Sequence, residues 1–199
     1  KLKEPEKEAI MARLPLVDNP SPEVAAIYNA AFPELSAFAN QIKTLAHHPT
    51  IARNLVRLYQ GFGQDSLVER RLIELAILTV SHLNRCRYCI THHAPLGARS
   101  GLSQAQLEAL AADEWESSAC FDEEEKLVIA YAAQITQDAR RVPDALFERL
   151  RARFNEAQIV ELTVRIALCN FFNRFNDVLQ LDIEPEALAT YQGLASGSL

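Results

Sequence analysis

A helical repeat of apolar residues runs through nearly the whole chain of 199 residues, and it constrains the fold more than any other feature of the sequence. Apolar side chains recur at spacings of three and four residues, the period of an amphipathic α-helix, and the strict alternation typical of strands is rare. The segment from about Leu67 to Leu83 is apolar around most of its circumference, which indicates a helix buried on all sides. The sequence therefore predicts an all-α fold, a compact helical bundle built around this segment.

Turn and capping residues divide the pattern into helices that fit one domain spanning residues 1–199. Besides the central segment, we expect helices over about 20–31, 33–46, 51–59, 86–99, 104–111, 122–138, 142–153, 155–179 and 185–193. Gly61 and Gly63 are expected to end the helix over 51–59, and Ser103 is expected to cap the helix over 104–111. A chain of this length with 49% hydrophobic residues buries a sizeable core without extra cross-links.

The sequence contains one internal echo. Residues 73–80 and 160–167 share an apolar pattern, and at the same offset Cys86-Arg-Tyr-Cys89 falls on Asn173-Arg-Phe-Asn176. The echo predicts two related helical halves, the second a degenerate copy over about 155–180. Short apolar helices also resemble one another by chance, so both interpretations stay open.

The charge balance argues against two classes of partner. The net charge is -6 and the isoelectric point is about 5.4, with no dense basic block, so little attraction draws the chain to nucleic acid or anionic lipid. No stretch reaches the roughly 18 apolar residues that span a bilayer, and residues 1–8 lack the apolar region of a signal peptide. We therefore expect a cytoplasmic protein that binds neither nucleic acid nor membrane.

Two of the four cysteines form the motif Cys86-Arg-Tyr-Cys89 at the expected start of a helix. Four cysteines are too few for a disulfide scaffold in a chain of this length, and a close pair in a reducing compartment indicates redox chemistry or metal binding. The spacing puts both sulfurs on one helix face, within reach of a disulfide, and a helix N-terminus stabilises a thiolate. His93 lies on the same face and is placed to exchange protons with either sulfur.

Glu74 lies in the densest part of the apolar segment. Burial there would raise the pKa of its carboxyl group and let it give and take a proton near neutral pH. Alternatively, Arg70 and Arg71 stand four and three residues earlier, where they can form a salt bridge with Glu74. The residue pattern alone leaves both roles open.

Together these residues resemble a known signature. Seven positions carry the resemblance: Glu74, Ser81, Asn84, Cys86, Tyr88, Cys89 and His93. They are similar to the Glu…Cys-x-x-Cys-x-x-x-His pattern of the alkylhydroperoxidase D-like proteins, in the carboxymuconolactone decarboxylase superfamily. The match is strongest over about residues 69–94, within a core of about 66–100. The chain length and the helix entry at His47-His48-Pro49 extend the resemblance, most closely to the peroxidase-related branch, over most of the chain.

The resemblance implies a thiol-dependent peroxidase, an oxidoreductase that reduces hydroperoxides through a redox-active disulfide and uses no metal or other cofactor. It implies Cys89 as the peroxidatic thiolate, Cys86 as the resolving thiol, and Glu74 with His93 as a proton relay. Cys89 would become a sulfenic acid, and Cys86 would condense with it to a disulfide that an unknown dithiol or protein reductant reopens. The resemblance and the apolar helices also favour a homo-oligomer, a dimer, trimer or hexamer.

One position departs from the family pattern. The best-known relatives carry a relay histidine directly before the second cysteine, where this chain has Tyr88. Tyr88 is expected either to orient a water or peroxide by hydrogen bonding, since a tyrosine is a poor base at pH 7, or to be a packed aromatic residue. Ser81 and Asn84 are further candidates for the relay or the pocket.

Other functions fit part of the pattern. The dithiol with His92 and His93 offers four zinc ligands, but their spacing is tighter than in zinc sites, and the two histidines cannot both face one ion from a regular helix. We therefore expect no metal. A general dithiol–disulfide oxidoreductase, a nonredox lactone-decarboxylase-like enzyme and a helical interaction module are the remaining alternatives.

The remaining cysteines and a group of asparagines are expected to be structural. Cys120 and Cys169 fit the role of small buried apolar residues better than that of redox partners. Asn170, Asn173 and Asn176 are unusual inside a helix. We expect them to hydrogen-bond across the core or a subunit interface, with pocket lining as the alternative.

Overall fold

The computed structural model describes residues 12–31 and 35–196, and the expectation about the start of the chain lies outside these residues. The described residues form ten α-helices and contain no strand, so the predicted all-α class is confirmed. The helices are α1 (Pro22–Ala31), α2 (Ala39–Leu45), α3 (Pro49–Gln64), α4 (Arg70–Leu83), α5 (Arg87–Arg99), α6 (Gln104–Ala111), α7 (Glu123–Asp138), α8 (Asp144–Arg153), α9 (Glu156–Leu179) and α10 (Pro185–Ala195).

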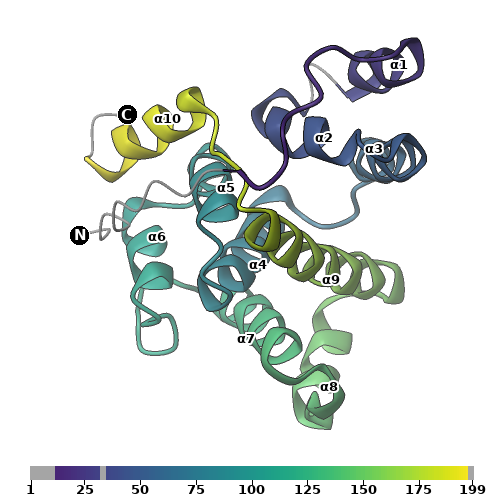
Figure 1. The fold of residues 1–199 in the computed structure, drawn as a ribbon. Helices are drawn as coiled ribbons and strands as arrows, with labels where there is room; N and C mark the ends of the chain where they lie inside the picture. The colour runs from purple at the N-terminus through teal and green to yellow at the C-terminus, as the bar shows by residue number, and fades with distance from the viewer. Residues whose placement is uncertain (1–11, 32–34, 197–199) are drawn as a thin grey trace.

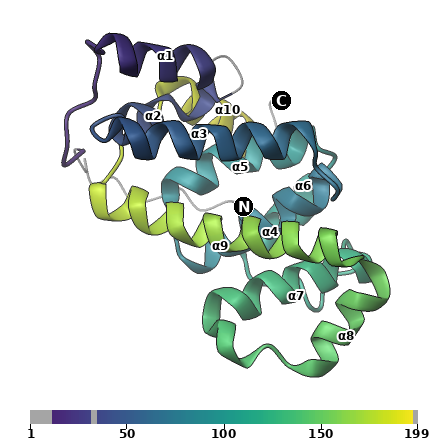
Figure 2. The ribbon, with the colours of Figure 1, turned by 90° about the vertical axis from the view of Figure 1, so that its right-hand side faces the viewer.

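The helices are arranged in layers around α4, α5 and α9 (Figure 1). Figure 2 shows α1, α2 and α3 on one side of this middle layer and α7 and α8 on the other. Helix α10 packs against α5. The middle layer therefore carries the dithiol motif, with helices from both halves of the chain covering it.

Helix α4 is the buried centre that the sequence predicts. Nine of its 14 residues are buried, and it packs against α5, α7 and α9. The helix begins at Arg70 rather than near Leu67, because the backbone of Glu69 is extended with a ψ of 135°. The backbone N–H of Leu67, before the helix, donates to the Glu161 carboxylate of α9 at 2.7 Å. The predicted buried helix is confirmed, with a start three residues later.

Three helices begin with reciprocal capping boxes. The N-cap residues Ser103, Asp122 and Asn155 each accept a hydrogen bond from a backbone N–H three residues later, and that residue's side chain bonds back to the N-cap. Such caps satisfy N–H groups that the helix itself leaves unpaired, and each stabilises its helix by about 1 kcal/mol. These local signals explain why the predicted starts of α6, α7 and α9 agree closely with the structure.

The expectation that Gly61 and Gly63 end a helix is wrong, because α3 continues to Gln64. Each glycine costs about 1 kcal/mol in a helix interior. Phe62, between them, packs under the guanidinium of Arg165, which lies 4.2 Å from the ring centroid. This contact with α9 offsets the low helix propensity of the glycines.

The two stretches of the internal echo have different structures. In the first, α4 and α5 are separate helices joined by a turn, whereas the second lies within the unbroken helix α9. Helix α9 packs against both α4 and α5. Descent of the two stretches from one ancestral unit stays a prediction.

Two features of the structure bear on membranes and partners. Within residues 12–31 and 35–196, no helix is long and apolar enough to cross a bilayer. The structure contains one chain, so the expected homo-oligomer and the cytoplasmic location stay predictions.

Candidate active site

A tight turn between α4 and α5 places the dithiol at the start of α5. Arg85 adopts a left-handed backbone conformation with a φ of 56°, and the N–H of Cys86 donates to the carbonyl of Ser81 at 3.0 Å. This is the long hydrogen bond of a Schellman motif, which ends a helix. Cys86 is therefore the N-cap of α5, and Cys89 lies in its first turn.

Cys86 and Cys89 are free thiols, and both are buried. The Cys86 thiol hydrogen-bonds to the Cys89 sulfur; this bond, burial and the negative charge on Cys89 raise the pKa of Cys86 far above its ordinary value. A thiol with a raised pKa keeps its proton, so Cys86 is the hydrogen-bond donor of the pair and the Cys89 sulfur is the acceptor. A helix N-terminus such as that of α5 favours a thiolate over a thiol, because its backbone N–H groups and dipole are positive there.

Asn176 of α9 donates a hydrogen bond to the Cys89 sulfur, a contact that the sequence did not predict. Its Nδ2 lies 3.2 Å from the Sγ of Cys89, and its Oδ1 accepts from the Nε2 of Gln41 at 2.8 Å. The second bond sets the orientation of the amide, so that the NH₂ group faces the sulfur. Two sequence signals pointed to this residue: an asparagine inside a helix, and the echo that aligns Asn176 with Cys89.

His93 pairs with the buried carboxylate of Glu74 and shares the wall of one cavity with Cys89. The Nδ1 of His93 lies 2.8 Å from the Oε2 of Glu74, and the Nη2 of Arg70 lies 2.7 Å from its Oε1. The Glu74 side chain is fully buried, whereas 16% of the His93 side chain is exposed. Because the carboxylate accepts a hydrogen bond from Nδ1, the Nε2 of His93 is the nitrogen left to take up or release a proton.

The pKa of Glu74 is shifted in the direction opposite to the expectation from the sequence. Burial raises the pKa, but the charge and hydrogen bond of His93 and the charge of Arg70 outweigh burial, and the pKa lies below its ordinary value. The expectation that Glu74 gives and takes a proton near neutral pH is therefore wrong. Glu74 is a fixed anion that orients His93. The salt bridge with Arg70 is present, whereas Arg71 pairs with Glu125 instead.

Tyr88 lies outside the cavity wall and belongs to a second buried cluster. Its hydroxyl donates to the Oε1 of Glu184 at 2.9 Å, and its ring stacks on that of His92 with centroids 4.2 Å apart. The Nε2 of His92 lies 2.8 Å from the Oε2 of Glu184. Burial and the charge of Glu184 raise the pKa of Tyr88, so its hydroxyl stays protonated. The structure favours the packed-aromatic role over contact with a peroxide.

Ser81 and Asn84 also lie outside the cavity wall. The Ser81 hydroxyl donates to the carbonyl of Ile77 at 2.7 Å. The Nδ2 of Asn84 donates to the Oδ1 of Asn170 at 3.0 Å and of Asn173 at 2.9 Å. These bonds tie the end of α4 to α9, as expected for asparagines that hydrogen-bond across a core.

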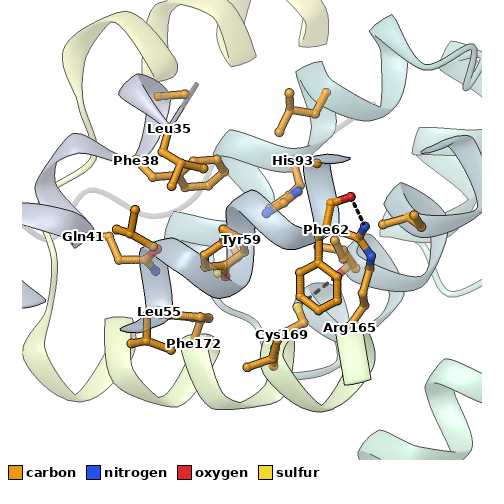
Figure 3. Close-up of a pocket in the computed structure, with 18 of the residues that line it drawn as sticks. Leu35, Phe38, Gln41, Leu55, Tyr59, Phe62, His93, Arg165, Cys169 and Phe172 are labelled. Atoms are coloured by element: carbon orange, nitrogen blue, oxygen red, sulfur yellow. Dashed lines mark hydrogen bonds between the residues drawn. The ribbon is translucent and has the colours of Figure 1, made fainter. Parts of the chain in front are cut away.

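A cavity of about 600 Å³ lies beside Cys89, between the layer of α2 and α3 and the middle layer of α4, α5 and α9. Cys89, His93 and Glu74 form part of its wall. In Figure 3, Gln41 lies toward one end of this cavity and Phe62 toward the other, with the His93 side chain between them. The structure thus brings the Cys89 sulfur and the His93 imidazole to the wall of one cavity.

Cys169 also reaches the cavity wall, although the sequence pattern placed it outside the site. Burial raises the pKa of Cys169 to about 12, so this thiol is protonated at neutral pH. A protonated thiol is a poor nucleophile, and Cys169 therefore acts as an apolar part of the wall. Among the residues that the structure describes, no group of three or more His, Cys, Asp or Glu side chains is placed to hold a metal ion.

Comparisons with known proteins agree with this fold. Residues 49–134 match the Carboxymuconolactone decarboxylase family. The uncharacterized protein YdfG of Bacillus subtilis is 30% identical over 118 residues, which cover 59% of this chain and 79% of YdfG.

Two solved structures have a similar fold. An uncharacterized peroxidase-related protein from Silicibacter sp. TM1040 has a TM-score of 0.78 at 19% identity, over 96% of this chain and all of that one (100%). An alkylhydroperoxidase AhpD core, an uncharacterized peroxidase-related protein from Ralstonia eutropha JMP134, has a TM-score of 0.75 at 19% identity, over 94% of this chain and 98% of that one. At this identity the likeness concerns the fold, and it confirms the predicted alkylhydroperoxidase D-like bundle.

Proposed function

The chain belongs to the carboxymuconolactone decarboxylase family, and we propose that it is a thiol-dependent peroxidase that reduces hydroperoxides with Cys89 as the attacking thiolate. The observation that carries the proposal is the surroundings of the Cys89 sulfur. It lies in the wall of a cavity, receives a hydrogen bond from Asn176, and has the Cys86 thiol as its neighbour. The peroxidase-related names of the two structural neighbours point in the same direction.

In the first step, the Cys89 thiolate attacks the terminal oxygen of the hydroperoxide. The S–O bond forms as the O–O bond breaks, which oxidises Cys89 to a sulfenic acid and reduces the peroxide to an alkoxide. The alkoxide takes a proton from the Nε2 of protonated His93 and leaves as an alcohol. The negative charge of Glu74, 2.8 Å from Nδ1, stabilises the protonated ring before this transfer.

In the second step, Cys86 attacks the sulfenic sulfur of Cys89. The S–S bond forms, and the thiol proton and the sulfenic hydroxyl leave as water. The hydrogen bond to Cys89 and the charge on Cys89 are two of the causes that raise the pKa of Cys86. Both disappear once Cys89 has been oxidised, so Cys86 releases its proton more readily at the stage that needs it. A dithiol or protein reductant then supplies two electrons and two protons and restores both thiols.

The alternatives use the site differently. A general dithiol–disulfide oxidoreductase uses both thiols but exchanges them with another disulfide, and a lactone-decarboxylase-like enzyme does not need the thiol pair. Cys89 is only 5% exposed and is reached from the cavity, which suits a small-molecule oxidant better than a protein disulfide.

Thiol counting after addition of one equivalent of cumene hydroperoxide to the reduced protein tests the proposal. Wild type is expected to lose two thiols together, and Cys86→Ser is expected to lose one and to form a sulfenic acid on Cys89 that dimedone traps. Cys89→Ser is expected to lose none in the same time. Cys120→Ser is the matched control, because Cys120 lies outside the cavity wall, and it should behave as wild type does.

Two outcomes would contradict the peroxidase. One is a wild-type protein that keeps all its thiols in the presence of hydroperoxide but exchanges them with oxidised glutathione, which supports the general oxidoreductase. The other is a thiol loss that is equally fast in Cys89→Ser, which assigns the reactivity to another cysteine.

A further inference from the structure

The cavity is much larger than the peroxide group that would react in it. Its volume of about 600 Å³ equals that of about twenty water molecules at ~30 Å³ each. It also lies within the range of roughly 300–1,000 Å³ that is typical of sites for larger organic ligands. Much of its wall is apolar, with contributions from Leu55, Tyr59, Ile77, Leu168 and Phe172. A peroxide with a large apolar substituent fills this space, whereas hydrogen peroxide leaves most of the wall without contacts.

Four residues on one side of α5 line the cavity. Cys89, His93, Leu96 and Arg99 all belong to the wall, and their spacings of four, three and three residues keep them on one side of the helix. Arg99 stands ten residues after Cys89, which corresponds to about 15 Å along the helix axis at ~1.5 Å per residue. Because Arg99 is exposed, this end of the cavity reaches solvent.

Arg99 differs from the two other arginines in the wall. Arg70 is paired with Glu74, and Arg165 is paired with Glu161 at 2.7 Å. Within residues 12–31 and 35–196, Arg99 forms neither an ion pair nor a side-chain hydrogen bond. It is thus a cation available to a ligand at the solvent end of a cavity whose inner wall carries Cys89.

We propose that the cavity binds an amphipathic hydroperoxide, a long apolar chain that ends in a carboxylate, with the carboxylate on Arg99 and the O–O bond at Cys89. This inference rests on the proposed peroxidase function and specifies its substrate class. A guanidinium binds a carboxylate through paired N–H donors, and the apolar wall covers the chain between the two ends. Helix α5 sets the separation between the carboxylate and the peroxide, so the site selects for the position of the peroxide along the chain.

The test compares three hydroperoxides on the reduced protein by stopped-flow measurement of thiol loss, below the concentration at which the long-chain compounds form micelles. The probes are linoleic acid hydroperoxide, its methyl ester and tert-butyl hydroperoxide. The acid is expected to react at least about tenfold faster than tert-butyl hydroperoxide, because the chain occupies the cavity. It is expected to react about fivefold faster than its ester, the size of effect that one partly exposed ion pair supports.

Two arginine variants locate the carboxylate site. Arg99→Gln is expected to bring the acid-to-ester ratio close to one. Arg57→Gln is the matched control, because Arg57 is also exposed but lies outside the cavity wall, and it should keep the wild-type ratio. A ratio of one in wild type, or a ratio that Arg99→Gln leaves unchanged, would overturn the inference. In either case, thiol loss with tert-butyl hydroperoxide would still support the peroxidase.

A binding measurement distinguishes the carboxylate site from the peroxidase function if the protein binds fatty acids but does not react with peroxides. Linoleic acid itself, which cannot oxidise a thiol, is expected to displace a fluorescent fatty acid from Cys89→Ser, and Arg99→Gln in that background is expected to weaken the displacement about fivefold. Displacement without thiol oxidation in wild type would support the carboxylate site and contradict the peroxidase. Absence of displacement would overturn the inference regardless of the oxidation result.

Discussion

His92 and His93 are neighbours in the sequence, yet they belong to two separate clusters of polar side chains. We call these the cavity cluster, formed by Arg70, Glu74 and His93, and the C-terminal cluster, formed by Tyr88, His92 and Glu184. In each cluster a ring nitrogen lies 2.8 Å from a buried glutamate oxygen, and Phe38 packs against both rings. The chemical groups are alike, but only the cavity cluster reaches the space beside Cys89.

The two imidazoles differ in how many of their ring nitrogens are hydrogen-bonded within the protein. Both nitrogens of His92 are engaged inside the protein, Nδ1 with the carbonyl of Tyr88 at 2.6 Å and Nε2 with Glu184 at 2.8 Å. Among the residues that the structure describes, His93 is bonded through Nδ1 to Glu74, and its Nε2 has no hydrogen-bond partner. A buried histidine–glutamate pair is therefore a structural bridge when both nitrogens are bonded within the protein. The proposed proton transfer needs a pair with one nitrogen left for the substrate, as in His93.

The largest expected difference between the clusters concerns the oxidation rate. Glu74→Gln removes the charge that stabilises protonated His93 and is expected to slow thiol loss with tert-butyl hydroperoxide about 100-fold at pH 7. Glu184→Gln, the matched change in the C-terminal cluster, is expected to slow it by less than about threefold. Stopped-flow measurements on folded variants check this, and similar losses in both variants would break the distinction between the clusters.

The second difference concerns stability. Glu184 accepts hydrogen bonds from Tyr88 and from the backbone N–H of Asn40 in addition to its contact with His92. Glu184→Gln weakens these bonds and is expected to lower the free energy of unfolding by about 2 kcal/mol in urea titrations. Glu186→Gln, an exposed acid in α10, should change it by less than about 0.5 kcal/mol. A variant of Glu184 as stable as wild type would argue against a structural bridge.

Removing the side-chain amide of Asn176, which donates to Cys89, is expected to have a smaller effect on the oxidation rate. Asn176→Ala removes a hydrogen bond that would stabilise a Cys89 thiolate and should slow both peroxide oxidation and iodoacetamide alkylation at pH 7 about tenfold. Asn170→Ala serves as the control, because Asn170 bonds to Asn84 rather than to a site thiol. If alkylation in Asn176→Ala is as fast as in wild type, the donor does not stabilise the thiolate.

The smallest effect concerns His82, a histidine that no carboxylate contacts within residues 12–31 and 35–196. Burial lowers the pKa of His82 to about 4, while the unfolded chain binds this proton near pH 6.5. The contribution of His82 to stability is therefore fully present above about pH 6.5 and is lost as the pH falls toward 4. Wild type should lose about 1 kcal/mol of stability through His82 between pH 7.5 and 5.5, and His82→Gln should remove this part of the loss.

Glu74 does not interfere with that measurement. Its pKa is lowered, so its contribution is present above the unfolded value near 4.3 and is lost only as the pH falls through the lower folded value. Between pH 7.5 and 5.5 it stays constant. Urea titrations of wild type and His82→Gln at these two pH values check the prediction, and the same pH dependence in both proteins would contradict it.

Four of the residues that the sequence predicts for the site lie close together in the structure, but two hydrogen bonds beside them are not predicted. Glu74, His93 and the two cysteines lie together in the structure, because a helical period and a short turn relate their positions. The contacts of Cys89 with Asn176 and of Asn176 with Gln41 span 87 and 135 residues. No local pattern encodes such pairs.

The sequence by itself determined the helical class, the capped helix starts and the position of the dithiol at a helix N-terminus. These features depend on interactions among residues within a few positions of one another. Only the tertiary structure decided the charge of Glu74, the donor to Cys89, the continuation of α3 past its glycines and the cavity itself. A pKa is set by the balance between burial and neighbouring charges, and an enclosed space requires walls from several helices, so both emerge only when distant segments pack together.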